Sequence, residues 1–168
     1  MKKNIIITGG LGYIGTELCK IYSGISWNNK ITVIDNRFIS ERVNQLRNWN
    51  INFVHGDILD KNLINKYCKN ADIVHHLAGV TDVPRVKSES SEEKDKKIET
   101  VAKEGTQNIL DVIDDKCKII LPSTHVVYEG IEKVKNDILE NEETKPVLSY
   151  ANSKATNEKQ LKNSGKNY

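Results

Sequence analysis

Residues 4–15, near the N-terminus, read NIIITGGLGYIG and combine two signals of one fold. Its first five residues are largely apolar and β-branched, which predicts a buried strand. The glycines after it match the frame GxGxxG from Gly10 and the frame GxxGxxG from Gly9, and both frames include Gly12 and Gly15. Such glycines allow a tight turn, close approach of the backbone to a pyrophosphate, and packing of the next helix. A glycine-rich turn can also be purely structural. Whether this turn binds a pyrophosphate therefore has to be judged from the rest of the sequence.

Short apolar runs alternate with longer amphipathic segments along the whole chain. This alternation predicts an α/β fold, a Rossmann-like doubly wound parallel sheet of about five strands in the order 3-2-1-4-5, with helices on both faces. The strands are expected at residues 4–8, 31–35, 51–55, 73–76 and 118–122, and two long helices at about 94–114 and 149–162. Residues 165–168 resemble a turn into a sixth strand, so we expect one domain over residues 1–168 and a C-terminal lobe that lies outside this chain.

Composition excludes several classes of protein. The formal net charge is +2, from 25 basic and 23 acidic residues, which predicts neither nucleic acid nor an anionic membrane as a partner. No stretch approaches the roughly 20 apolar residues of a membrane span. The three cysteines, Cys19, Cys68 and Cys117, have no metal-binding spacing and indicate free thiols in a cytoplasmic protein.

An acidic residue stands at the end of the second predicted strand. Asp35 follows Gly15 by 20 residues (35 − 15), where a carboxylate accepts hydrogen bonds from an adenosine ribose. Such a carboxylate repels a 2′-phosphate, which favours NAD over NADP, although Arg37 could partly offset that repulsion. The alternative is an aspartate that only caps a turn.

The sequence YANSK at 150–154 places Tyr150 and Lys154 four residues apart in a predicted helix. At this spacing their Cβ atoms lie about 5–6 Å apart on one face. A phenol has a reference pKa of about 10. A neighbouring ammonium favours its phenolate and makes it a usable proton acceptor. Taken alone, this pattern also occurs by chance as a surface tyrosine beside a solvated lysine.

Five motifs in order make the chain resemble the extended short-chain dehydrogenase/reductase family, of the NAD-dependent nucleotide-sugar epimerase/dehydratase type. They are TGGLGYIG at 8–15, HGD at 55–57, HLAG at 76–79, STHVVY at 123–128, and the YxxxK pair. The resemblance implies that Tyr150 is the general acid/base, that Lys154 binds the nicotinamide ribose and lowers the pKa of the tyrosine, and that Thr124 hydrogen-bonds the reacting oxygen. It further implies that NAD contacts Gly9, Gly12, Tyr13, Ile14, Gly15, Asp35, Asn36, Asp57, Ile58, Leu77, Ala78, Gly79, Tyr150 and Lys154. Glu158 also matches a common family position.

The positions at which this chain departs from the family pattern narrow the range of activities that we expect of it. Dehydratases of this family carry an Asp-Glu pair after the catalytic threonine, whereas this chain has His125 and Val126. We therefore expect an epimerase that transiently oxidises a sugar carbon of a nucleotide sugar. The alternatives are a dehydrogenase or reductase of a non-sugar alcohol, or an NAD-binding sensor without turnover. Ala102 and Glu129 also depart from the family, and its members commonly form homodimers through the two long helices.

Two adjacent histidines close the fourth predicted strand. His75 and His76 should face opposite sides of the sheet, because side chains alternate along a strand. We expect both to be packing residues rather than metal ligands.

Overall fold

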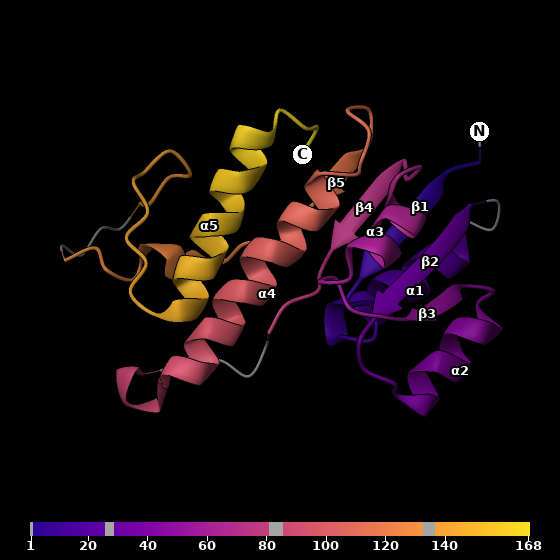
Figure 1. The fold of residues 1–168 in the computed structure, drawn as a ribbon, viewed down its shortest axis with the longest axis horizontal. Helices are drawn as coiled ribbons and strands as arrows, with labels where there is room; N and C mark the ends of the chain where they lie inside the picture. The colour runs from indigo at the N-terminus through magenta and orange to yellow at the C-terminus, as the bar shows by residue number, and fades with distance from the viewer. Residues whose placement is uncertain (1, 26–28, 81–85, 133–136) are drawn as a thin grey trace.

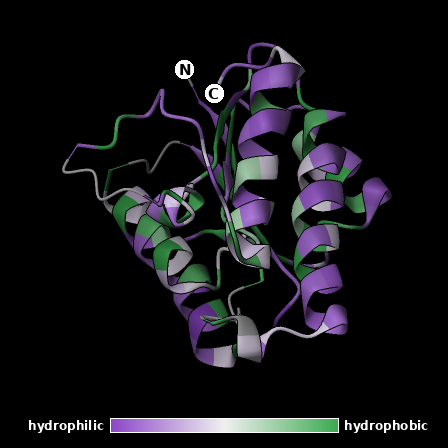
Figure 2. Cartoon of the chain, turned by 90° about the vertical axis from the view of Figure 1, so that its left-hand side faces the viewer, coloured by the Kyte–Doolittle hydropathy of each residue, from purple (hydrophilic) through white to green (hydrophobic). Residues whose placement is uncertain are grey.

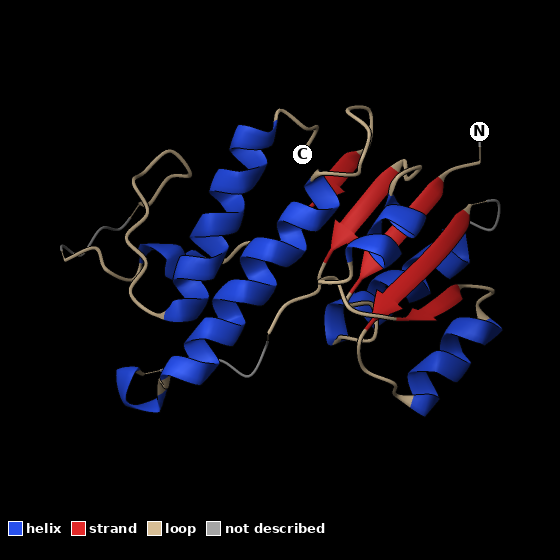
Figure 3. Cartoon of the chain, in the orientation of Figure 1, coloured by secondary structure: helices blue, strands red, loops and turns tan. Residues whose placement is uncertain are grey.

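The computed structural model describes residues 2–25, 29–80, 86–132 and 137–168 (Figure 1). Its sheet has five parallel strands in the order β3-β2-β1-β4-β5, which confirms the predicted fold class and strand order. The strands are β1 (Asn4–Thr8), β2 (Lys30–Asp35), β3 (Asn52–His55), β4 (Ile73–His76) and β5 (Lys118–Ile120). Figure 3 shows them as neighbouring arrows that run in one direction.

The central strand explains why the sheet forms. Ile5 and Ile7 are buried in one hydrophobic cluster, whereas Ile6 is buried in a second cluster on the other face. A strand with helices on both faces needs apolar side chains at successive positions, and for this reason its sequence is continuously apolar. In Figure 2 the strands at the centre of the view are mainly green, and purple is concentrated on the surrounding helices and loops.

The helices form one layer on each side of the sheet. The first cluster contains apolar residues of α1 (Tyr13–Ile25) and α2 (Ser40–Asn48). The second contains residues of α3 (Lys61–Cys68), α4 (Glu92–Leu110) and α5 (Ser149–Ser164). Helices α4 and α5 lie side by side (Figure 1). Two short 3₁₀ helices, η1 (Lys87–Glu89) and η2 (His125–Tyr128), occur in the connections. Among the described helices, none combines the length and the apolar character that crossing a membrane requires.

Local chemistry sets the ends of these elements. The carboxylate of Asp60 accepts from the backbone N–H groups of Asn62 and Leu63, both at 3.0 Å, and so caps α3. The strand expected at 118–122 ends at Ile120, because Pro122 has no N–H for the ladder. The helix expected at 94–114 spans Glu92–Leu110. It begins earlier than expected because the side chain of Ser91 caps its N-terminus. At the other end of the chain, Asn167 forms a single parallel bridge beside Lys118, where the sequence suggested a turn into a further strand.

The three cysteines should be chemically inert in the folded chain. Cys19 and Cys68 are fully buried and Cys117 is 1% exposed. Burial raises the pKa of the Cys19 and Cys68 thiols to about 12 and that of Cys117 to about 11, so little reactive thiolate forms near neutral pH. With Ellman's reagent we expect negligible labelling of the native chain and three labelled thiols after denaturation in guanidinium. Rapid labelling of any native thiol would contradict this prediction.

Candidate active site

The candidate site lies at the carboxyl edge of the sheet. The strand order changes direction between β1 and β4, and ligands of open parallel α/β sheets bind in the crevice at such a switch point. The glycine-rich turn emerges from β1 at this edge. It is held by hydrogen bonds from Gly9 N to Ile34 O at 2.8 Å and from Gly12 N to Gly9 O at 3.0 Å.

Two glycines of the turn cannot be replaced without displacing backbone. Gly9 has a φ of 68°, and a Cβ there would lie 2.6 Å from Ala78 N in the loop after β4. A Cβ on Gly15 would lie 2.5 Å from the Cα of Gly10, so this glycine lets α1 start directly against the turn. The result is an open helix N-terminus at the floor of the crevice, which fits a pyrophosphate group.

A continuous groove crosses this turn. It consists of two adjoining cavities of about 270 Å³ and 330 Å³ that share the walls formed by Gly9, Gly12 and residues 77–80. The first cavity is also lined by Tyr13, Ile14, Gly15, Tyr150 and Lys154. The second is also lined by Asp35, Asn36, Asp57 and Ile58. The structure therefore brings together all the predicted cofactor-contacting residues along one groove.

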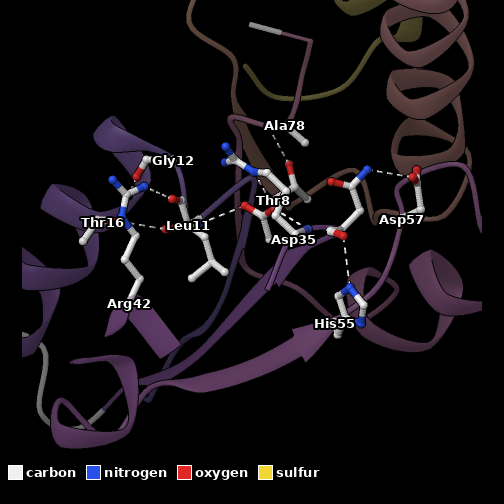
Figure 4. Close-up of polar contacts among 12 residues, drawn as sticks. Thr8, Leu11, Gly12, Thr16, Asp35, Arg42, His55, Asp57 and Ala78 are labelled. Carbon is white, nitrogen blue, oxygen red and sulfur yellow. Dashed lines mark hydrogen bonds and ion pairs between the residues drawn. The ribbon is translucent and has the colours of Figure 1, made fainter. Parts of the chain in front are cut away.

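Polar contacts organise the end of the groove near Asp35 (Figure 4). Asp35 Oδ2 accepts from Leu11 N at 3.0 Å, which ties β2 to the glycine-rich turn. Arg42 supports the same turn from α2 by donating to the carbonyl oxygen of Leu11. Asn36 Nδ2 donates to Asp57 Oδ2 at 2.9 Å and so joins the ends of β2 and β3. These bonds fix two carboxylates at the cavity wall.

The other end of the groove carries the predicted reacting pair. Tyr150 and Lys154 are both on α5, and Lys154 Nζ lies 6.0 Å from the centre of the Tyr150 ring. Lys154 Nζ also donates to Pro122 O at 2.9 Å. Burial lowers the pKa of Lys154, and the nearby negative charge of Glu158 opposes that shift. The structure thus holds an ammonium group close to the phenol ring inside the groove.

Glu158 has a definite partner in this region. Ser123, which lines the groove, donates its hydroxyl to Glu158 Oε1. The contact ties the loop after β5 to α5, one turn beyond Lys154. Sequence reasoning identified Glu158 only as a family position and assigned no role to Ser123.

Thr124 is the predicted site residue that does not line either cavity. Its Oγ1 accepts from Val126 N at 3.4 Å and caps the 3₁₀ helix η2. The neighbouring Pro122 and Ser123 do line the groove. A role for Thr124 in holding a substrate oxygen stays a prediction.

A chain of buried polar groups, which the sequence did not predict, runs beneath the groove. Thr8 Oγ1 accepts from Ala78 N at 3.3 Å and contacts His76 Nδ1 at 2.8 Å. His76 Nε2 lies 3.0 Å from Thr106 Oγ1, which also accepts from Asn157 Nδ2 at 2.9 Å. Because Thr8 already accepts from Ala78, its own hydrogen is free to point at Nδ1, and the chain fits a neutral His76 with hydrogen on Nε2. It connects β1, β4, α4 and α5.

The electrostatics keep His76 neutral. Burial and the nearby charge of Lys154 lower its pKa to about 3. His75 faces the opposite side of the sheet, where its Nε2 lies 2.8 Å from the hydroxyl of Tyr22 on α1. Within the described ranges, no group of three or more His, Cys, Asp or Glu side chains is arranged to hold a metal ion.

Comparison with known proteins agrees with this geometry. The chain is 34% identical over 130 residues to a UDP-N-acetyl-alpha-D-glucosaminuronate decarboxylase of Bacillus cytotoxicus, covering 76% of this chain and 38% of the relative. A UDP-N-acetylglucosamine 4-epimerase of Methanobrevibacter ruminantium, solved with UDP-N-acetylmuramic acid, superposes with a TM-score of 0.77 at 29% identity, covering 97% of this chain and 51% of that one. A UDP-glucose 4-epimerase of Brucella ovis, solved with NAD, superposes with a TM-score of 0.76 at 28% identity, covering 96% and 47%.

Fold and site together define an extended short-chain dehydrogenase/reductase of the epimerase/dehydratase type, as the sequence predicted. Residues 6–167 match the model of the 3-beta hydroxysteroid dehydrogenase/isomerase family, and the chain belongs to that family of enzymes. The chain spans about half the length of the two solved epimerases, or less, and 38% of the decarboxylase.

Proposed function

We propose that this chain is the NAD-binding part of a nucleotide-sugar epimerase. The observation that carries the proposal is the groove, which begins at Asp35, crosses the glycine-rich turn and ends at Tyr150 and Lys154. Its lining suits a dinucleotide with adenosine at the end near Asp35 and nicotinamide at the end near Tyr150. The decarboxylase and the two epimerases act on, or were solved with, UDP-linked compounds or NAD.

The residues at the nicotinamide end of the groove would have separate roles in oxidising the sugar. Bound NAD would supply a hydride acceptor. Lys154 would hold the ribose hydroxyls near the ring and favour the phenolate of Tyr150 through its positive charge. Tyr150 would take the proton of a sugar hydroxyl while the hydrogen on the same carbon leaves as hydride, and would return the proton when hydride comes back to the other face. Thr124 would orient the sugar oxygen.

The choice of epimerase depends on the fate of the oxidised sugar. Elimination of water needs a further acid/base pair, and His125 and Val126 occupy the positions where family dehydratases have carboxylates. With no carboxylate there, return of the hydride is the simplest outcome. A dehydrogenase acting on a non-sugar alcohol would use the same Tyr150 and Lys154, so substrate turnover has to distinguish the two.

Residues 1–168 form the cofactor domain in this proposal, and sugar recognition would belong to a C-terminal lobe.

The proposal does not include a homodimer through α4 and α5. Among the described residues, the large exposed apolar side chains lie outside both helices. Exposed apolar residues on these helices would have supported such an interface.

Calorimetric titration of the chain with NAD tests the proposal, and we expect saturable binding with one site. Replacing Gly9 by alanine should weaken that binding at least tenfold, because the new methyl group would press on Ala78 at a φ of 68°. Gly24→Ala is the matched control, since a Cβ there meets nothing within 4 Å, and its NAD affinity should equal that of the parent. Absence of NAD binding by the folded parent would refute the proposed function.

A further inference from the structure

Helix α5 begins without a capping side chain of its own. Its N-cap residue is Leu148, whose side chain cannot accept a hydrogen bond, so the backbone N–H groups at this end of the helix need an acceptor from elsewhere. Glu129, which precedes Leu148 by 19 residues, supplies that acceptor. Its Oε1 accepts from Val147 N at 2.9 Å and from Leu148 N at 2.8 Å. The negative charge of the carboxylate also suits the positive end of the helix dipole.

The residues that lead into α5 are also tied to η2 through the backbone. Lys145 N donates to Val127 O, and Gly130 N donates to Lys145 O, both at 2.8 Å. A Cβ on Gly130 would lie 2.6 Å from Lys145 O, so the two segments are in close contact. Together with the two bonds to the carboxylate, these bonds form what we call the η2–α5 clamp, which joins residues 127–130 to residues 145–148.

The η2–α5 clamp connects the two segments that carry the proposed substrate-contacting groups. Thr124 is the N-cap of η2 and Glu129 is its C-cap, so these residues lie at opposite ends of one 3₁₀ helix. Tyr150 is the second residue of α5. In the proposed reaction Thr124 and Tyr150 act on the same sugar oxygen, so their side chains need fixed positions relative to each other. Misplacement of a reacting group by about 1 Å can cost on the order of 100-fold in rate.

We infer that Glu129 is a positioning residue, whose carboxylate fixes the start of α5 against η2 and thereby sets Tyr150 relative to Thr124. The inference rests on the proposed function and deepens it by adding a residue that acts through Tyr150. Glu129 is exposed and lines neither cavity, so it does not contact a cofactor in the groove. It is also a position at which this chain departs from the family pattern, so the contact belongs to this chain rather than to that pattern.

Steady-state kinetics of the protein that joins this domain to the proposed sugar-binding lobe, with NAD at saturation, test the inference. Glu129→Ala should lower kcat for the nucleotide sugar about 10- to 100-fold, because Tyr150 and Thr124 lose their fixed geometry. KM for the sugar and the dissociation constant of NAD should stay within about threefold, since Glu129 does not line the groove. Glu129→Gln should keep kcat within about fivefold of the parent value, because its amide oxygen can still accept from the same two N–H groups.

Asp60→Ala is the matched control. The Asp60 carboxylate also accepts from two backbone N–H groups at the start of a helix, those of Asn62 and Leu63, and Asp60 lines neither cavity. Both alanine variants should lower the urea midpoint of unfolding, but only Glu129→Ala should lower kcat. An equal fall of kcat in both variants, or the parent kcat in Glu129→Ala, would overturn the inference alone. A parent protein that converted no nucleotide sugar would overturn the proposed function, and the positioning role with it.

Discussion

Replacing Tyr150 by phenylalanine, in a protein that joins this domain to the proposed sugar-binding lobe, should reduce turnover of a nucleotide sugar by a factor on the order of 10²–10⁴, the usual contribution of a general acid/base. The change removes only the phenolic oxygen, so the ring still lines the groove beside Lys154. We therefore expect NAD affinity to stay within about threefold of the parent value, since the oxygen acts on the substrate proton rather than on cofactor binding. Turnover is measured by chromatographic separation of the sugar epimers, and affinity by calorimetry.

Tyr67→Phe provides a matched control for this prediction. Tyr67 lies on α3 and lines neither cavity, so removal of its hydroxyl should leave both turnover and NAD affinity unchanged. If Tyr150→Phe turned over at the parent rate, the acid/base assignment would be wrong. If the protein that joins this domain to the proposed sugar-binding lobe bound NAD but converted no nucleotide sugar, the NAD-binding sensor would be favoured, because a sensor binds the cofactor without turnover.

The fold was predictable because it depends on local and repeated signals. Continuous apolar runs such as residues 5–7 indicate strands covered on both faces, and the longer segments between them require crossover helices. The ends of elements were less predictable. The strand at 118–122 stops at Ile120, and the helix expected at 94–114 stops at Leu110, where Val112 N and Ile113 N both donate to Ile109 O. These ends depend on single hydrogen bonds that an apolar pattern does not encode.

The parts of the site that could be predicted are those in which the spacing of a short motif fixes where the residues lie. The spacing of Tyr150 and Lys154 fixes their relative placement on a helix, and the glycines fix the turn. The contacts of Arg37 with Asp35, of Ser123 with Glu158, and of His76 with Thr8 and Thr106 were not predicted as such. The last two sets join residues from 30 to 68 positions apart, and only the folded sheet brings them together. The sequence did contain one signal for the buried polar chain: His76 is a polar residue at a strand position that was expected to be buried.

His76→Leu should lower the free energy of unfolding by about 3 kcal/mol near pH 7. Leucine has a similar size but removes both hydrogen bonds of a fully buried polar chain, leaving Thr8 and Thr106 each short of one partner. Urea unfolding followed by circular dichroism measures the change. His125→Leu is the control, since His125 is exposed and its replacement should alter stability by less than about 0.5 kcal/mol.

The same variant should change how stability depends on pH. The pKa of His76 falls from its ordinary value of 6.5 to about 3 on folding, so between these values the unfolded chain binds a proton that the folded chain does not. This contribution is fully present above pH 6.5 and is lost as the pH falls toward 3, by roughly 1.4 kcal/mol per pH unit. The stability difference between parent and His76→Leu should therefore shrink by about 2 kcal/mol between pH 7 and pH 5. His75, whose pKa is also lowered by burial, contributes equally to both proteins and cancels. If the stability difference stayed constant over this range, His76 would have to take up a proton in the folded protein as readily as in the unfolded one. That result would contradict a neutral His76 held by hydrogen bonds to Thr8 and Thr106.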